Sequence, residues 1–270
     1  MLKINSNWSK VLLRIGMLCS AASVSLMTLS AAAEELRSAG TEVPYVRAPD
    51  ATNEAHIERT GELTFVRRAV TPKQWEGDIS FTLDSARPGA LSTDPDGRIV
   101  GRIGVGGGLG LRLTATRGGA TAKYRPGIGA FYQFVGRDGG PLSIALAVDY
   151  RPEGFNEVKG EVEAGLHITY AAKRAEITGN FVGGMEPGFK QGDLEAAISA
   201  GYRLLPNLLV GAQGRHRLAL PEAMYEDVVG LMASYRVWRA QVTAVAGAEA
   251  LTIFDTRYGL IGSIGVAFGF

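Results

Sequence analysis

The sequence is poor in the residues that build the most easily recognised functional sites. It holds one cysteine, Cys19, among 270 residues, so neither a disulfide framework nor thiol chemistry is expected in the mature chain. The formal net charge is +1, and without a basic excess there is no bulk attraction to nucleic acid. No nucleic-acid partner is therefore predicted.

Long apolar runs are missing after the N-terminus. No segment beyond residue 33 has 18 uninterrupted apolar residues, which excludes a helical membrane protein because a spanning helix needs about 20. Residues 1–33 combine Lys3 and Lys10, an apolar stretch from Ile15 to Ser30, and Ala31–Ala33. This order predicts a cleaved secretory signal peptide over 1–33.

Alternation of apolar and polar residues dominates the rest of the chain. Between residues 194 and 204, one face carries Leu194, Ala196, Ile198, Ala200, Tyr202 and Leu204. The opposite face carries Asp193, Glu195, Ala197, Ser199, Gly201 and Arg203. A period of two is typical of a strand with one apolar face, whereas a helix would scatter these charges around its circumference.

The same pattern predicts about twelve strands in an all-β chain, with ten to fourteen compatible with it. The predicted strands cover 76–84, 97–106, 108–117, 121–135, 141–151, 157–171, 174–184, 191–204, 207–218, 224–237, 239–250 and 258–270. Their lengths suit transmembrane strands of about 9–11 residues. The two strands beside Gly106–Gly108 are compatible with either a hairpin or one long strand.

Short and long connections alternate along the chain. Short turns are expected at 172–173, at 205–206 and near Trp238, and longer loops at 85–96, 152–157, 185–190, 219–223 and 251–257. Antiparallel outer-membrane barrels have short periplasmic turns and longer extracellular loops. A transmembrane antiparallel up-and-down β-barrel over residues 75–270 is therefore predicted.

The last strand carries the most specific signal. Alternating apolar residues lead to a terminal phenylalanine on one face: Tyr258, Leu260, Ile264, Val266, Phe268 and Phe270. The chain thereby resembles the Gram-negative outer-membrane β-barrel proteins, a porin-like class, without matching a specific family. The resemblance implies location in the outer membrane, contact with its lipid, and recognition of this strand by the barrel-assembly machinery. The alternative is a soluble two-sheet fold, whose strands also alternate.

In a membrane barrel the polar face lines the lumen and the apolar face meets lipid. The predicted lumen and selectivity residues are Arg98, Arg102, Arg112, Arg125, Asp149, Lys159, Glu161, Glu163, Glu195, Arg203, Arg215 and Arg236. Both signs occur, with a modest excess of cations. Two functions fit such a lumen. One is a narrow pore or passive transporter for small, anionic solutes. The other is a closed structural or partner-binding barrel whose lumen charges pair.

Residues 34–74 are polar and show no sustained period. They carry Pro44, Pro49 and Pro72, and their main apolar run is Leu63–Val66. A periplasmic N-terminal extension is one interpretation. A plug folded into the lumen, which would gate transport, is the other.

No catalytic residue, metal ligand or cofactor site is predicted. His56 lies in the tail, His167 is expected among lumen charges, and His216 lies on an apolar face. An outer-membrane lipid hydrolase would need a serine near such a histidine, but Ser199 and Ser234 are expected in the lumen. The glycines from Gly104 to Gly110 precede another strand, so they do not form a phosphate-binding loop.

Overall fold

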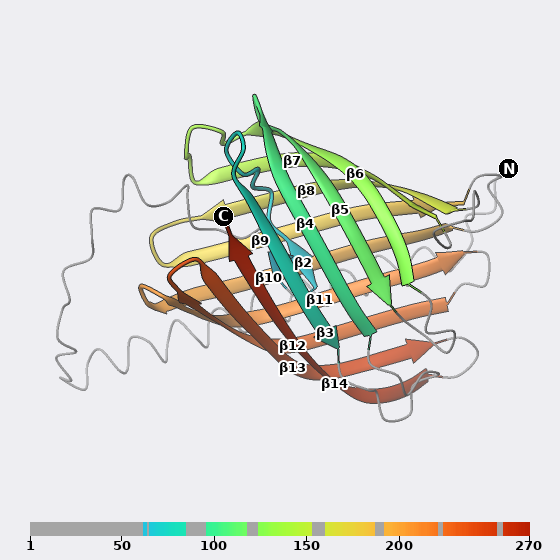
Figure 1. Ribbon diagram of the computed structural model, residues 1–270. Coiled ribbons are helices and arrows are strands. Elements are labelled where there is room, and N and C mark those ends of the chain that lie inside the picture. Colours follow the sequence, from blue (N-terminus) through green and yellow to red (C-terminus); the bar gives the residue numbers. More distant parts are fainter. Residues whose placement is uncertain are drawn as a thin grey trace, which may run out of the picture. The chain divides into compact units, whose positions relative to one another are not determined.

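The computed structural model describes residues 62–63, 65–84, 96–117, 124–152, 160–186, 192–220, 224–252 and 256–270. The predicted signal peptide, His56 and Lys159 lie outside these ranges. Within them, no helix is long and apolar enough to cross a membrane. The chain folds as strands throughout the described part (Figure 1).

Twelve antiparallel strands form a closed barrel, as predicted. They are β3 (Gly77–Asp84), β4 (Asp96–Gly106), β5 (Leu109–Arg117), β6 (Tyr124–Val135), β7 (Leu142–Pro152), β8 (Gly160–Ala171), β9 (Ala175–Met185), β10 (Gly192–Leu205), β11 (Leu208–Leu220), β12 (Met224–Val237), β13 (Ala240–Thr252) and β14 (Thr256–Gly269). Each strand pairs with its neighbours in the sequence, and β14 closes the barrel on β3. The observed ends differ from the predicted ones by three residues at most.

The segment around Gly106 is a hairpin rather than one long strand. Gly106, Gly107 and Gly108 all have positive φ values, of 115°, 61° and 82°. Side chains rarely tolerate this backbone region, whereas glycine adopts it without a steric penalty. The glycine run therefore reverses the chain between β4 and β5.

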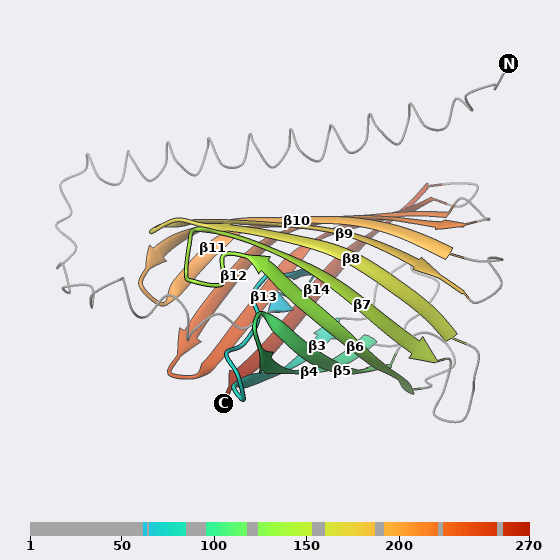
Figure 2. The same ribbon diagram turned by 90° about the horizontal axis from the view of Figure 1, so that it is seen from above.

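The two ends of the barrel differ. Short connections, such as Pro206–Asn207 between β10 and β11, gather at the end where Phe270 bonds to Gly77 through both backbone groups, at 2.9 Å each. We call this the turn end and the opposite one the loop end (Figure 2). The rule for bacterial barrels places the turn end in the periplasm. The longer turn at 136–141 also lies at this end and closes with a bond from Gly139 N to Gly136 O.

The outer surface of the barrel is apolar. Large side chains that face outward and are exposed include Leu113, Ile128, Leu146, Phe181, Leu231 and Leu260. Near the turn end, exposed aromatic residues follow one another around the barrel: Trp75, Tyr132, Tyr170, Tyr235 and Trp238. An apolar band bordered by aromatic side chains is the surface that a bilayer and its interface require.

Two further strands lie apart from the barrel sheet. β1 (Glu62–Leu63) and β2 (Val66–Arg67) pair only with each other in the sheet topology of the described residues. The Leu63–Val66 run therefore adds no thirteenth strand to the barrel, and the strand count stays even.

The energetic cost of a charge on a lipid-facing surface depends on its depth in the bilayer. This dependence tests whether the apolar outer face of the barrel contacts lipid. Leu231 is 71% exposed in the middle of β12, so Leu231→Arg is expected to lower the free energy of unfolding by about 2–4 kcal/mol. Val237→Arg at the end of the same strand should cost about 0–1 kcal/mol, because arginine there reaches the interface. Urea unfolding in lipid vesicles measures both. Equal losses for the two variants would contradict the assignment of this face to lipid.

Candidate functional site in the barrel lumen

The described residues of 62–76, called the inner segment below, run through the lumen, reach the turn end at the exposed residues Lys73–Trp75 and continue directly into β3. Leu63, Phe65, Val66, Ala69 and Val70 are all buried, and Leu63 has no exposed surface. Hydrogen bonds and apolar contacts join the segment to wall residues from most strands of the barrel. The segment therefore fills lumen space that the wall side chains alone do not occupy.

The backbone of the inner segment is bound by side chains of the wall. Alternate amide N–H groups each donate to a wall oxygen: Phe65 to Gln213 (3.1 Å), Arg67 to Asn180 (2.6 Å), Ala69 to Thr169 (2.9 Å) and Thr71 to Gln133 (2.8 Å). These acceptors come from β11, β9, β8 and β6. The side chain of Asn180 also donates to Arg67 O at 2.7 Å. A buried backbone donor without a partner is costly, so the wall side chains replace the neighbouring strand that the segment lacks.

On the other side of the lumen the contact is apolar. The side chains of Leu63, Phe65 and Val66 form one cluster with inward-facing wall residues, which are Ala197, Leu209, Val228, Met232, Val245 and Ile261. Apolar side chains pointing into a water-filled lumen would be unfavourable. The inner segment covers them.

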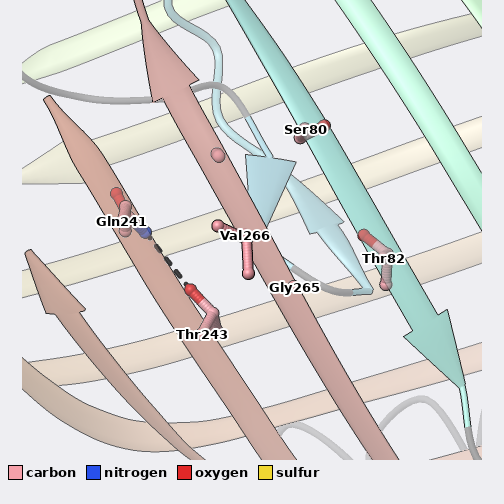
Figure 3. A pocket seen from close by; sticks show the side chains of 7 residues that line it. Ser80, Thr82, Gln241, Thr243, Gly265 and Val266 are labelled. Carbon is pink, nitrogen blue, oxygen red and sulfur yellow. Dashed lines mark hydrogen bonds between the residues drawn. The ribbon is translucent and has the colours of Figure 1, made fainter.

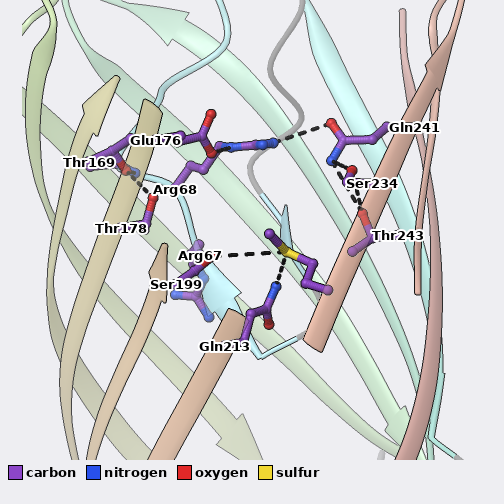
Figure 4. Close-up of polar contacts among 12 residues, drawn as sticks. Arg67, Arg68, Thr169, Glu176, Thr178, Ser199, Gln213, Ser234, Gln241 and Thr243 are labelled. Carbon is purple, nitrogen blue, oxygen red and sulfur yellow. Dashed lines mark hydrogen bonds and ion pairs between the residues drawn. The ribbon is translucent and has the colours of Figure 1, made fainter. Parts of the chain in front are cut away.

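Two arginines of the inner segment bind carboxylates of the wall. Arg68 Nε lies 2.5 Å from Glu176 Oε1, and its Nη1 donates to Gln241 Oε1 at 3.2 Å (Figure 4). Arg67 Nη1 lies 3.5 Å from Asp149 Oδ2. Arg68 therefore connects β9 to β13 through the lumen.

The wall has its own ion pairs between strands. Arg102 binds Asp78 and donates to Val70 O of the inner segment at 2.9 Å, and Arg112 lies 2.5 Å from Asp149. Towards the loop end the pairs are Arg215–Glu226, Arg217–Asp193 and Arg151 with both Glu161 and Glu163. Many charges predicted to line the lumen are thus engaged with a charge of opposite sign.

The remaining predicted lumen residues lie near the two ends of the barrel. Arg98, Glu195, Arg203 and Arg236 are half-buried and Arg125 is exposed. Arg203 Nη1 donates to Pro206 O at 3.1 Å, at the turn end. The residues predicted for membrane insertion lie on the outer face of β14 or, for Phe270, directly after it. Tyr258, Leu260, Ile264, Phe268 and Phe270 are exposed and Val266 is half-buried.

Three carboxylates meet near the loop end, although their spacing in the sequence gave no sign of it. Oxygens of Glu161, Glu163 and Asp193 lie within 4.8 Å of one another, because β9 alone separates β8 from β10. Arg151 and Arg217 bind the same groups. The cluster is part of a network of alternating charge.

His216 lies on the outer face, as predicted, and is not part of the lumen. Its Nδ1 is 2.6 Å from Asp227 Oδ1, and its Nε2 has no hydrogen-bond partner among the described residues. Ser199 and Ser234 are buried in the lumen, where Ser234 bonds to Gln241. The described residues therefore place neither serine beside this histidine.

A small pocket lies among residues of β3, β13 and β14. Its lining includes the hydroxyls of Ser80, Thr82 and Thr243, the amide of Gln241 and the small residues Gly265 and Ala267 (Figure 3). Gln241 also accepts the bond from Arg68. Uncharged polar side chains therefore extend along the wall from Gln241, which binds Arg68, to Ser80 and Thr82 of β3.

The uncharged residues of this site were missed by the sequence analysis. Gln133, Thr169, Asn180, Gln213 and Gln241 all lie on inward faces, so the alternation could have placed them in the lumen. A stronger signal was available in four apolar residues on otherwise polar faces, which are Val228 and Met232 of β12, Val245 of β13 and Ile261 of β14. Apolar side chains on the lumen face indicate that another part of the protein covers them.

Comparison with known proteins reveals likeness in fold only. No family model and no curated protein matches the chain. The solved KdgM porin in complex with disordered oligogalacturonate has a TM-score of 0.50 at 13% identity, over 72% of this chain and 99% of that one. The NanC porin gives 0.53 at 9% over 70% and 98%, and an outer-membrane channel from Pseudomonas putida F1 gives 0.52 at 9% over 74% and 97%.

These similarities and the apolar outer surface lead to the same assignment. The predicted resemblance to Gram-negative outer-membrane barrels and the twelve-strand fold class are confirmed. The chain has the barrel fold of these outer-membrane porins and channels, closed here by twelve antiparallel strands.

The buried pair between Arg102 and Asp78 should contribute strongly to stability. Asp78→Asn leaves the guanidinium of Arg102, which is 3% exposed, without its charged partner. Removing one member of a buried pair costs about 3–5 kcal/mol, so chemical unfolding should show a loss of roughly 3 kcal/mol. Asp138→Asn, in the exposed turn at 136–141, is the matched control. A loss below about 0.5 kcal/mol for Asp78→Asn would show that the pair does not stabilise the barrel.

Proposed function

We propose that the protein is a passive outer-membrane channel for small solutes, and that the inner segment is a plug that closes it. Eight strands leave an interior filled by side chains and sixteen leave an open channel, so twelve strands enclose an intermediate space. Here that space holds a separate segment, attached by individual side-chain hydrogen bonds. This observation carries the proposal, since bonds of this kind can break without opening the barrel sheet.

A second candidate is a closed barrel that acts as a structural or partner-binding platform. The pairing of lumen charges supports it, because pairs such as Arg112–Asp149 hold neighbouring parts of the wall together. The two proposals differ in one respect. The channel requires the inner segment to leave the lumen, and the platform requires it to stay.

The basic turn end supports a preference for small anions. Arg137, Lys173, Arg174, Arg203, Arg236 and Arg239 lie in or beside its connections. Acidic residues at this end, among the described ones, are Glu76, Asp78, Asp138 and Glu176, and of these Asp78 and Glu176 are paired with Arg102 and Arg68. A rim of one sign raises the local concentration of ions of the opposite sign.

Gly104 offers a way to loosen the base of the plug without changing the wall side chains that bind Phe65 to Thr71. A Cβ at Gly104 would lie 2.2 Å from Pro72 O and 2.1 Å from Lys73 O, both in the inner segment. Gly104→Ala should displace the base of the plug and increase the opening frequency roughly tenfold, which corresponds to about 1.4 kcal/mol. Single-channel recording of the full chain in planar bilayers measures this.

Gly101→Ala is the matched control on the same strand, because no atom lies within 4 Å of a Cβ built there. It should behave as the unmodified chain. If folded and inserted Gly104→Ala protein passes no more current than the control, the platform is favoured over the channel.

The basic residues of the turn end, called the rim here, lead to a separate prediction about ion selectivity. Replacing both Arg203 and Arg236 by alanine removes two cations of the rim and should lower the anion-to-cation permeability ratio by about twofold. Reversal potentials under a salt gradient report this ratio. Arg117→Ala, an exposed residue at the loop end, should leave it unchanged. An unaltered ratio in the double variant would remove the rim as the source of selectivity.

A further inference from the structure

The wall holds a guanidinium group of the inner segment between side chains of two strands. Glu176 of β9 and Gln241 of β13 bind Arg68 on two of its nitrogens, Nε and Nη1. All three side chains are buried, with Glu176 and Arg68 at 3% and 5% exposure. A carboxylate and an amide oxygen facing one planar guanidinium form a specific arrangement for this cation.

The amide of Gln241 is oriented by the wall and not by the inner segment. Its Nε2 donates to Ser234 Oγ at 2.8 Å and lies 3.3 Å from Thr243 Oγ1. Ser234 and Thr243 are themselves 2.9 Å apart (Figure 4). Because these hydroxyls engage the nitrogen, the oxygen of Gln241 is directed at the guanidinium, and this arrangement does not depend on Arg68.

Groups that recognise a peptide backbone lie next to this site. Asn180 binds both the N–H and the C=O of Arg67, and Thr169 accepts the N–H of Ala69. Paired donor and acceptor contacts to one residue are the contacts that an extended peptide makes with a sheet edge. The wall thus binds the main chain on both sides of Arg68 as well as its side chain.

We propose that Glu176 and Gln241 form a binding site for guanidinium-bearing solutes, arginine-containing short peptides above all, and that Arg68 occupies it as an internal substitute for such a ligand. The inference rests on the proposed channel function and names its ligand class. Exchange of Arg68 for a ligand guanidinium leaves the charge of the site unchanged. Asp149, which binds Arg67, is also paired with Arg112 of the wall.

The test uses the full chain and L-argininamide as the probe. In the unmodified channel the probe competes with Arg68, so it should raise the opening frequency. In Arg68→Gln the site has lost its internal cation, so the same probe should bind there and block the current instead. Glu176→Gln should weaken both effects about tenfold or more, the loss expected when a charge-assisted bond becomes a neutral one. Choline at equal concentration controls for ionic strength.

A second variant and a second readout keep the test decisive. Arg68→Lys keeps the charge but not the planar fork, and it should open more often than the unmodified chain while folding equally well by heat-dependent gel mobility. Calorimetric titration of Arg68→Gln protein in detergent with L-argininamide measures binding without conductance.

The outcomes separate the two proposals. Binding in the calorimeter with silent bilayers would overturn the channel but keep the site. Conductance with no response to L-argininamide, or an equal response in Glu176→Gln, would overturn the site but keep the channel.

Discussion

The structure depends on the pairing of backbone hydrogen-bonding groups where water cannot reach them. In the bilayer this requires a closed sheet, because an open edge would leave unpaired N–H and C=O groups in hydrocarbon. The pairing of β14 with β3 meets that requirement. Inside the lumen the same requirement falls on the inner segment, whose backbone bonds to β4 only near its end, between Trp75 N and Gly104 O and between Gly104 N and Glu76 O, among the described residues. Its N–H groups are satisfied instead by amides and hydroxyls of the wall, such as Gln213 and Thr169.

The barrel could be predicted from the sequence because every wall strand separates two environments. Lipid on one side and the lumen on the other impose a strict alternation, as in β8, where Leu166 and Ile168 face outward and His167 and Thr169 are buried inside. The strand ends followed from the residues that break this alternation. The choice between one strand and a hairpin at Gly107 depended on backbone angles, which a run of glycines permits but does not dictate.

The site was less predictable because its contacts depend on register and on residues far apart in the chain. Alternation puts Asp193 and Arg217 in the lumen, but only the pairing of β10 with β11 brings them together. The bond between Ala69 and Thr169 spans 100 residues and follows no period. The inner segment itself shows no sustained period, since from Phe65 to Thr71 its backbone N–H groups bond to side chains and not to a neighbouring strand. For that reason its sequence left both an extension and a plug open.

The place where the inner segment joins the wall has a consequence for biogenesis. β3 is both the continuation of this segment and the strand that β14 must find to close the barrel, and the segment ends beside the seam at Gly77 and Phe270. A chain that closed first would have to thread the segment through the finished turn end. Wrapping β6 to β13 around it beforehand avoids threading, and it gives the nascent sheet a template that sets its curvature before the last strand arrives. On this view the strands fold around the inner segment during assembly, whatever the segment does afterwards.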